Sequence, residues 1–147
     1  MPNLRYFFYS FLIFTLLGLS ACSKPPVKPD LTNLFAQLKA VSEVPANKSP
    51  ATGELSANLN TQTGVLNWTI HYSDLTGPIT AAHFHGPATA GNNAGVAIPI
   101  NGNLANPIKG VNTLSTNQVS ELMDGKWYVN LHTSANPDGE IRGQITH

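Results

Sequence analysis

The chain has 147 residues, with eight basic residues, eight acidic residues and a single cysteine. This length has room for one domain around one hydrophobic core. The balanced charge and the lack of a basic cluster argue against a nucleic-acid partner, which would need a basic face. No glycine-rich phosphate loop, GxSxG elbow or Cys-His pair is present, so nucleotide binding and acyl transfer have no support either.

The N-terminal segment has the order of an export signal. Arg5 supplies a positive charge, a largely apolar run extends from Phe11 to Leu19, and small residues precede Cys22. An uncleaved transmembrane anchor is the alternative, but the apolar run is shorter than the roughly 18 residues of a spanning helix. We therefore expect residues 1–21 to be a signal peptide that is removed.

The end of this segment, Leu19–Cys22, resembles the lipobox of bacterial lipoproteins, in which the cysteine is acylated and the chain is cut before it. A lipidated Cys22 explains an odd cysteine count in an exported protein. Several acyl chains on one residue give stable anchoring. Ser23 stands where an inner-membrane retention aspartate would be, so the resemblance implies an outer-membrane address in the cell envelope.

A proline-rich spacer follows, with the sequence SKPPVKPD over residues 23–30. We expect the lipidated cysteine and the spacer to occupy residues 22–33, and the folded domain to occupy residues 34–147.

Beyond the spacer, apolar residues alternate with polar ones in short segments separated by turn residues. Leu66, Trp68, Ile70 and Tyr72 show this best, and they are predicted to point inward. Only Thr116–Met123 has helical spacing, with Gly125 as its C-terminal stop. The pattern predicts an all-β domain with one short helix. The candidate strands are Leu34–Ala40, Gly53–Leu59, Val65–Tyr72, Ile79–His85, Val96–Ile100, Trp127–Thr133 and Glu140–Thr146.

Three histidines occupy outward positions of the predicted strands. His83 and His85 lie two residues apart, so they leave the same face of one strand about 7 Å apart. His132 lies on another candidate strand, which must neighbour the first for the three to meet. Three neutral imidazoles form a site for copper or zinc, with copper favoured by the Irving-Williams order.

Polar neighbours of His132 are predicted from a hairpin with a turn at residues 136–139. This hairpin brings Glu140 and Arg142 close to His132, and Asn130 shares its face. We expect Asn130 and Glu140 to accept the remaining ring N–H bonds and so fix the histidine tautomers.

A structural role for the three histidines is the alternative. Their rings then bond to Asn130, Glu140 and the backbone and hold adjacent strands in register. Bound zinc with an open position could activate water, but Glu140 is the only evident carboxylate base. No catalytic residue is identified, and whether the domain is an enzyme stays open.

Four further motifs stand out along the domain: AVSEVP at Ala40–Pro45, HFHGPA from His83, YVNLHT from Tyr128 and NPDGEIRGQI from Asn136. Together they resemble the CHRD domain, named for its occurrence in chordin. The likeness covers Leu34 to His147. It implies an immunoglobulin-like β-sandwich or barrel of short antiparallel strands, distantly similar to copper/zinc superoxide dismutases.

The dismutase comparison applies to a few residues. His83 and His85 match the His-x-His copper strand, His132 stands in for a later copper ligand, and Arg142 resembles the anion-guiding arginine. A bridging histidine, a zinc loop and a disulfide pair are missing from the sequence, so we do not expect a two-metal dismutase.

Two functions follow as hypotheses. In the first, a lipid-anchored domain binds a single copper or zinc ion through His83, His85 and His132. In the second, a metal-free domain uses the loops Pro87–Ala94 and Asn101–Asn117 to contact another envelope or extracellular protein.

Overall fold

The computed structural model describes residues 30–147. The predicted signal peptide, Cys22 and the spacer up to residue 29 lie outside this range. The elements in chain order are β1 (Leu31–Lys39), the 3-10 helix η1 (Ala40–Ser42), β2 (Thr52–Asn60), β3 (Val65–Ser73), β4 (Ile79–His85), β5 (Val96–Pro99), β6 (Ile108–Thr113), α1 (Thr116–Met123), β7 (Tyr128–Thr133) and β8 (Ile141–Gln144).

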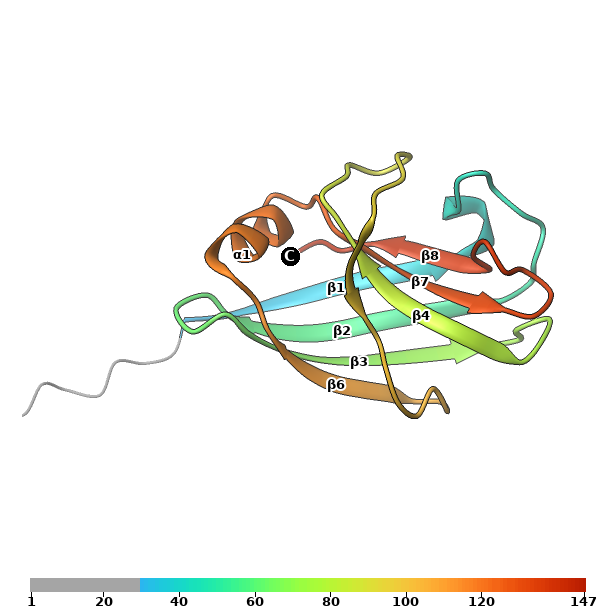
Figure 1. Cartoon of the computed structure of the whole chain (residues 1–147), viewed down its shortest axis with the longest axis horizontal. Helices are drawn as coiled ribbons and strands as arrows, with labels where there is room; N and C mark the ends of the chain where they lie inside the picture. The colour runs from blue at the N-terminus through green and yellow to red at the C-terminus, as the bar shows by residue number, and fades with distance from the viewer. Residues whose placement is uncertain (1–29) are drawn as a thin grey trace, which may run out of the picture.

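The eight strands form one antiparallel sheet in the order β5-β4-β7-β8-β1-β2-β3-β6. The sheet curls into a half-barrel, so that β4 and β7 lie in front of β1, β2 and β3 in Figure 1. The curl brings strands that are distant in the sheet order into contact, because Trp68 on β3 packs edge-on against Phe84 on β4 with ring centroids 5.4 Å apart. The prediction of an all-β fold with one short helix is confirmed.

The hydrophobic core fills the inside of the curl. Leu66, Trp68 and Ile70 of β3 point inward as predicted, and the neighbouring strands alternate in the same way. Each fully buried leucine or isoleucine contributes about 1.5–3 kcal/mol to folding. Among residues 30–147, no helix is long and apolar enough to cross a membrane.

Helix α1 covers one end of the sheet, near the C-terminus (Figure 1). It begins with a capping box, in which Ser115 and Gln118 exchange side chain to backbone hydrogen bonds, and it ends before Gly125, which has a φ of 68°. Leu122 lies on its buried face. The predicted bounds of this helix agree with the structure.

Two elements differ from the sequence prediction. Strand β1 begins at Leu31, inside the segment expected to be spacer, because residues 31–39 pair with the whole length of β2. Strand β6 lies within the predicted loop Asn101–Asn117. It is an edge strand in which only Ile108 is buried, so its sequence lacks a clear apolar alternation.

A fully buried carboxylate ties four parts of the chain together. Glu140 accepts hydrogen bonds from Ser49 Oγ at 2.6 Å and from the Thr76 N–H at 2.7 Å. The hydroxyl groups of Thr76 and Thr133 donate as well. Burial acts to raise the pKa of Glu140, but these hydrogen bonds outweigh it and lower the pKa. The network joins the β2 and β4 entry loops to the β7–β8 hairpin.

We expect Glu140→Ala to lower the free energy of unfolding by about 3 kcal/mol or more, because several buried donors lose their acceptor at once. Urea unfolding of the purified protein measures this. The control is Glu54→Ala on the exposed face of β2, which should change stability by about 0.5 kcal/mol or less. Equal effects of the two substitutions would contradict the role assigned to the network.

Glu43 carries a second buried carboxyl group, which lacks the hydrogen bonds that Glu140 has. Glu43 is 7% exposed, and its Oε1 has no hydrogen-bond partner. The carboxyl lies against Gly139, where a Cβ would come within 2.6 Å of Oε1. Burial raises the pKa of Glu43 to about 7, although Arg142 and the backbone of Val44 act to lower it. Folding therefore favours the protonated form of this group.

The pKa of Glu43 predicts a pH dependence of stability. Since the folded protein binds this proton more tightly than the unfolded chain, its contribution is complete below a pH of about 4.5 and is lost as the pH rises to about 7. Glu43→Gln cannot ionise, so we expect it to remove this loss. At about pH 8 the free energy of unfolding of the variant should then exceed that of the wild type by up to about 3 kcal/mol. Urea unfolding of both proteins across this range gives the difference, and a constant difference at every pH would contradict it.

Candidate metal centre

Strands β4 and β7 position the three histidines. In their antiparallel register, His83 lies opposite Asn130 and His85 lies opposite Tyr128. Ala82 and Phe84 alternate with the two histidines and are buried in the core, which directs the imidazoles to the other face. His132 is two residues beyond Asn130 on β7, so it is a diagonal neighbour of His83.

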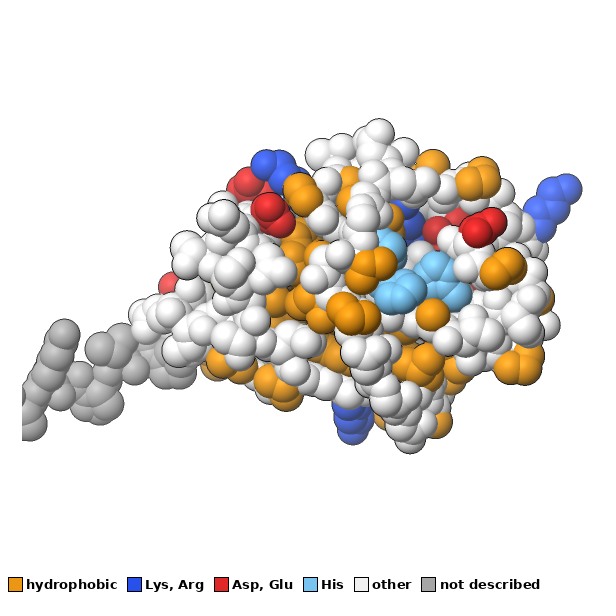
Figure 2. Space-filling model, in the orientation of Figure 1, with side chains coloured by type: hydrophobic (Ala, Val, Ile, Leu, Met, Phe, Trp, Pro, Cys, Tyr) orange, Lys and Arg blue, Asp and Glu red, His pale blue; other side chains and the backbone are white. Residues whose placement is uncertain are grey.

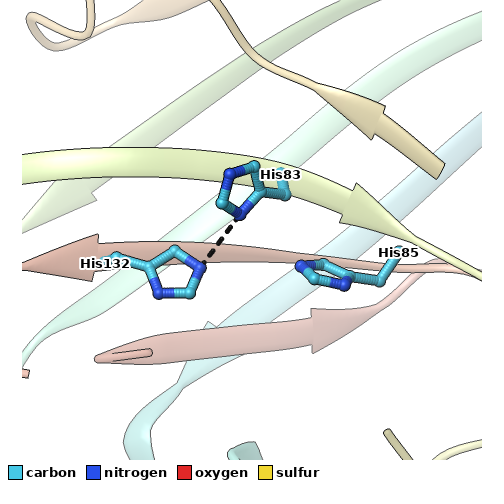
Figure 3. A group of neighbouring side chains, drawn as sticks. All are labelled: His83, His85 and His132. Carbon is cyan, nitrogen blue, oxygen red and sulfur yellow. Dashed lines mark hydrogen bonds between the residues drawn. The ribbon is translucent and has the colours of Figure 1, made fainter. Parts of the chain in front are cut away.

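The ring nitrogens of the three histidines lie close together. One nitrogen from each ring can be chosen so that all three are within 4.8 Å of one another. His83 Nδ1 and His132 Nε2 are 3.1 Å apart (Figure 3). The histidine side chains form one patch on the molecular face shown in Figure 2. The structure thus brings together His83, His85 and His132, as predicted from the sequence.

Backbone carbonyl groups fix the orientation of two rings. His132 Nδ1 donates to the Pro137 carbonyl at 2.9 Å, and His85 Nδ1 donates to the Ala94 carbonyl at 3.0 Å. A neutral imidazole has only one N–H, so the Nε2 atom of each ring carries a lone pair. Metal-binding histidines are commonly oriented by a hydrogen bond of this kind from the other nitrogen.

The environment favours neutral rings. Burial lowers the pKa of His83, and the neighbouring His132 and His85 lower it further. Burial also lowers the pKa of His85, although hydrogen bonds with Ala94 and Asn130 act in the opposite direction. Neutral imidazole is the form that binds a metal ion, so both rings are ready to act as ligands at neutral pH.

Asn130 lies at the centre of the cluster. Its Oδ1 is 3.1 Å from His85 Nε2 and 3.1 Å from His132 Nε2. With both Nδ1 atoms already donating, these contacts bring lone pairs together with no proton between them. A cation at this point relieves the repulsion. If the Asn130 side-chain amide is rotated by half a turn, its NH₂ group donates to the same two nitrogens. Both Nε2 atoms then have a hydrogen-bond partner without a metal ion.

The spacing suits a first-row metal ion. Metal-nitrogen bonds of about 2.0–2.1 Å in a tetrahedral site place ligand nitrogens about 3.3 Å apart. The contacts of 3.1 Å in the cluster are close to this value, and the three chosen ring nitrogens all lie within 4.8 Å of one another. Three imidazole nitrogens with an amide oxygen are ligands for Cu(II) or Zn(II).

The Glu140 carboxylate accepts hydrogen bonds from Ser49, Thr76 and Thr133 and not from His132, contrary to the prediction from the hairpin. The β7–β8 ladder ends at the pair Leu131 and Ile141, and the chain turns at Gly139, which has a φ of 130°. The Glu140 side chain therefore follows the Thr133 face, where its carboxylate is enclosed. It neither fixes a histidine tautomer nor acts as a base at this site.

Arg142 lies near the cluster but contacts it through another residue. Its guanidinium carbon is 3.3 Å from the centroid of the Tyr128 ring, and Tyr128 is stacked on His85 with centroids 4.8 Å apart. Since the strand order is β4-β7-β8, Tyr128 separates the arginine from the imidazole. The sequence did not predict this role of Tyr128, because only the register of β4 with β7 shows that Tyr128 faces His85.

The comparisons with known proteins identify one relationship. No curated protein and no solved structure matches the chain. The family model of the CHRD domain matches residues 34–145, which is most of the chain and includes the three histidines, Asn130 and Arg142. The chain therefore belongs to the CHRD domain family.

Proposed function

We propose that this CHRD domain binds a single copper ion, with zinc as the alternative metal, through His83, His85 and His132. The observation that carries the proposal is the convergence of three ring nitrogens within 4.8 Å of one another. Carbonyl hydrogen bonds that turn Nε2 of His85 and His132 toward Asn130 support it. At a site with imidazole and amide ligands, the Irving-Williams order favours copper.

Binding is a better-supported role than catalysis. Among the described residues, the group that can hold a metal contains histidines alone, and Glu140 is enclosed by its own hydrogen bonds. A metal-bound water would therefore lack a carboxylate base in this cluster. Storage, transfer or sequestration of the ion fits these residues better than turnover.

Copper titration of the purified protein tests the proposal. We expect one Cu(II) per chain, with affinity that falls as the pH drops through about 6 because the imidazoles become protonated. Replacement of His83, His85 or His132 by Ala should each weaken binding by about 100-fold or more. His71→Ala is the matched control, since His71 is exposed on β3 and should have no effect.

Two results would reject the metal proposal. The first is a wild-type protein that retains no copper after mild dialysis, and the second is a set of three single variants that bind copper as the wild type does. The histidines then act as a hydrogen-bonded link between β4 and β7.

The second candidate function is a protein-interaction module. Membership of the CHRD family favours it, and so does the open edge of β5, where Val96 is 51% exposed. In this case the loop Pro87–Ala94 and the β5 edge contact another envelope or extracellular protein. A domain that fails the copper titration but binds such a partner would have this function.

We further infer from the lipobox-like sequence that the protein is exported and anchored through Cys22. Changing Cys22→Ser removes the acylated thiol, so the variant should leave the membrane or remain as an uncleaved precursor. Detergent-phase partitioning measures the change. Partitioning of the variant equal to that of the wild type would contradict the anchor at Cys22.

A further inference from the structure

Arg142 carries a positive charge into the interior of the domain without a carboxylate to pair with it. The residue is 2% exposed, and no carboxylate oxygen of the described chain lies within 4.0 Å of its guanidinium nitrogens. Burial of an unpaired charge is costly unless other polar groups compensate for the lost water. The groups that surround the guanidinium therefore indicate what this side chain holds in place.

Two hydrogen bonds connect Arg142 to the end of the β4–β5 loop. Nη1 donates to Asn93 Oδ1 at 2.9 Å, and Nη2 donates to the Asn92 carbonyl at 2.6 Å. The next residue is Ala94, whose carbonyl accepts from His85 Nδ1. Arg142 thus holds the two residues that directly precede the acceptor of the His85 ring.

Packing does little to hold this part of the loop. Residues 89–93 are all exposed. A cavity of about 260 Å³ lies between the loop tip, the end of η1 and β8, and its lining includes Ala90, Gly91, Glu43 and Arg142. Hydrogen bonds therefore fix the loop, and those from the guanidinium are charge-assisted, which makes them roughly twice as strong as bonds between neutral groups.

Tyr128 is a second connection from Arg142 to His85. The guanidinium carbon is 3.3 Å from the centroid of the Tyr128 ring, and this ring lies parallel to the His85 imidazole with an interplanar angle of 1°. The Tyr128 hydroxyl also accepts from the Ala94 N–H at 3.2 Å. One guanidinium therefore orders both the stacking partner of His85 and its backbone acceptor.

These contacts decide which nitrogen of His85 carries the proton. Nδ1 is 3.0 Å from the Ala94 carbonyl, and Nε2 is 3.1 Å from Asn130 Oδ1. A neutral imidazole has one N–H, so it can donate to only one of these oxygens. If the Ala94 carbonyl moves away, the proton is favoured at Nε2 and donates to Asn130. Nε2 then has no lone pair for a metal ion.

We propose that Arg142 is a positioning residue for the metal centre, which holds Ala94 and Tyr128 against His85 and so keeps the Nε2 lone pair free. This inference rests on the proposed metal binding and assigns to that site a residue that acts through its neighbours. Since coupling between two sites is reciprocal, a metal ion on His85 should also hold the β4–β5 loop more firmly. The metal then orders the loop that the second candidate function assigns to partner contact.

Asn93→Ala tests the loop contact, because it removes the acceptor of Nη1 and leaves Arg142 in place. We expect Cu(II) binding to weaken by about 10-fold or more. In the metal-free variant at about pH 8, nitrogen NMR of the His85 ring should show a shift from the Nδ1–H form toward the Nε2–H form. Thr89→Ala is the control in the same loop, since its hydroxyl bonds within the loop, and it should bind copper as the wild type does.

Two further variants separate the contacts. The Asn93 amide also donates to the Val44 carbonyl, so Asn93→Asp keeps the acceptor for Arg142 and loses only this donor. It should retain copper affinity. Arg142→Lys keeps the charge but lacks the forked donors, and it should weaken binding at least as much as Asn93→Ala. Urea unfolding checks that each variant remains folded.

Three results overturn the inference while the wild type still binds copper. The first is an unchanged copper affinity in Asn93→Ala. The second is a metal-free wild type in which His85 carries its proton on Nε2. The third is an Asn93→Asp variant as weak as Asn93→Ala, which would assign the effect to the Val44 contact. A wild type that binds no copper instead rejects the proposed function and this inference together, and the wild-type titration alone reveals that case.

Discussion

The hydrogen-bond network of the Glu140 carboxylate is the constraint on which the arrangement of this domain depends. It connects Ser49 before β2, Thr76 before β4, and Thr133 at the end of β7. These segments are far apart in sequence, and sheet pairing alone does not set their relative positions. Glu140 directly precedes β8, so its carboxylate holds these three segments against the end of the β7–β8 ladder.

Two other groups of polar side chains are less completely hydrogen-bonded than the Glu140 network. Glu140 has a donor at each oxygen, which makes its charge compatible with burial. Glu43 lacks a partner at Oε1, and the histidine cluster brings lone pairs together around Asn130. Turning the Asn130 amide pairs the two histidine nitrogens within the protein, whereas Glu43 Oε1 has no hydrogen-bond partner.

The sequence predicts the elements whose pattern is local. Alternation revealed β3, helical spacing and Gly125 revealed α1, and two-residue spacing placed His83 and His85 on one face. Strand β6 escaped prediction because an edge strand buries little. The position of the Glu140 side chain was not predicted, because it depends on where the β7–β8 ladder ends. The stacking of Tyr128 on His85 was not predicted either, because it depends on the register of β4 with β7. Long-range pairing determines these features, and a single sequence contains no direct signal of it.

Strand β1 also determines how the domain would be presented at a surface. Leu31 pairs with Asn60 at one end of the strand, and Lys39 pairs with Arg142 at the other. Nine residues of strand span about 30 Å. In the lipid-anchored arrangement that we propose, with the tether on the N-terminal side of β1, the cavity at Glu43 and Arg142 lies at the end of the domain away from the membrane. Small solutes from bulk solvent would then reach that end without first approaching the bilayer.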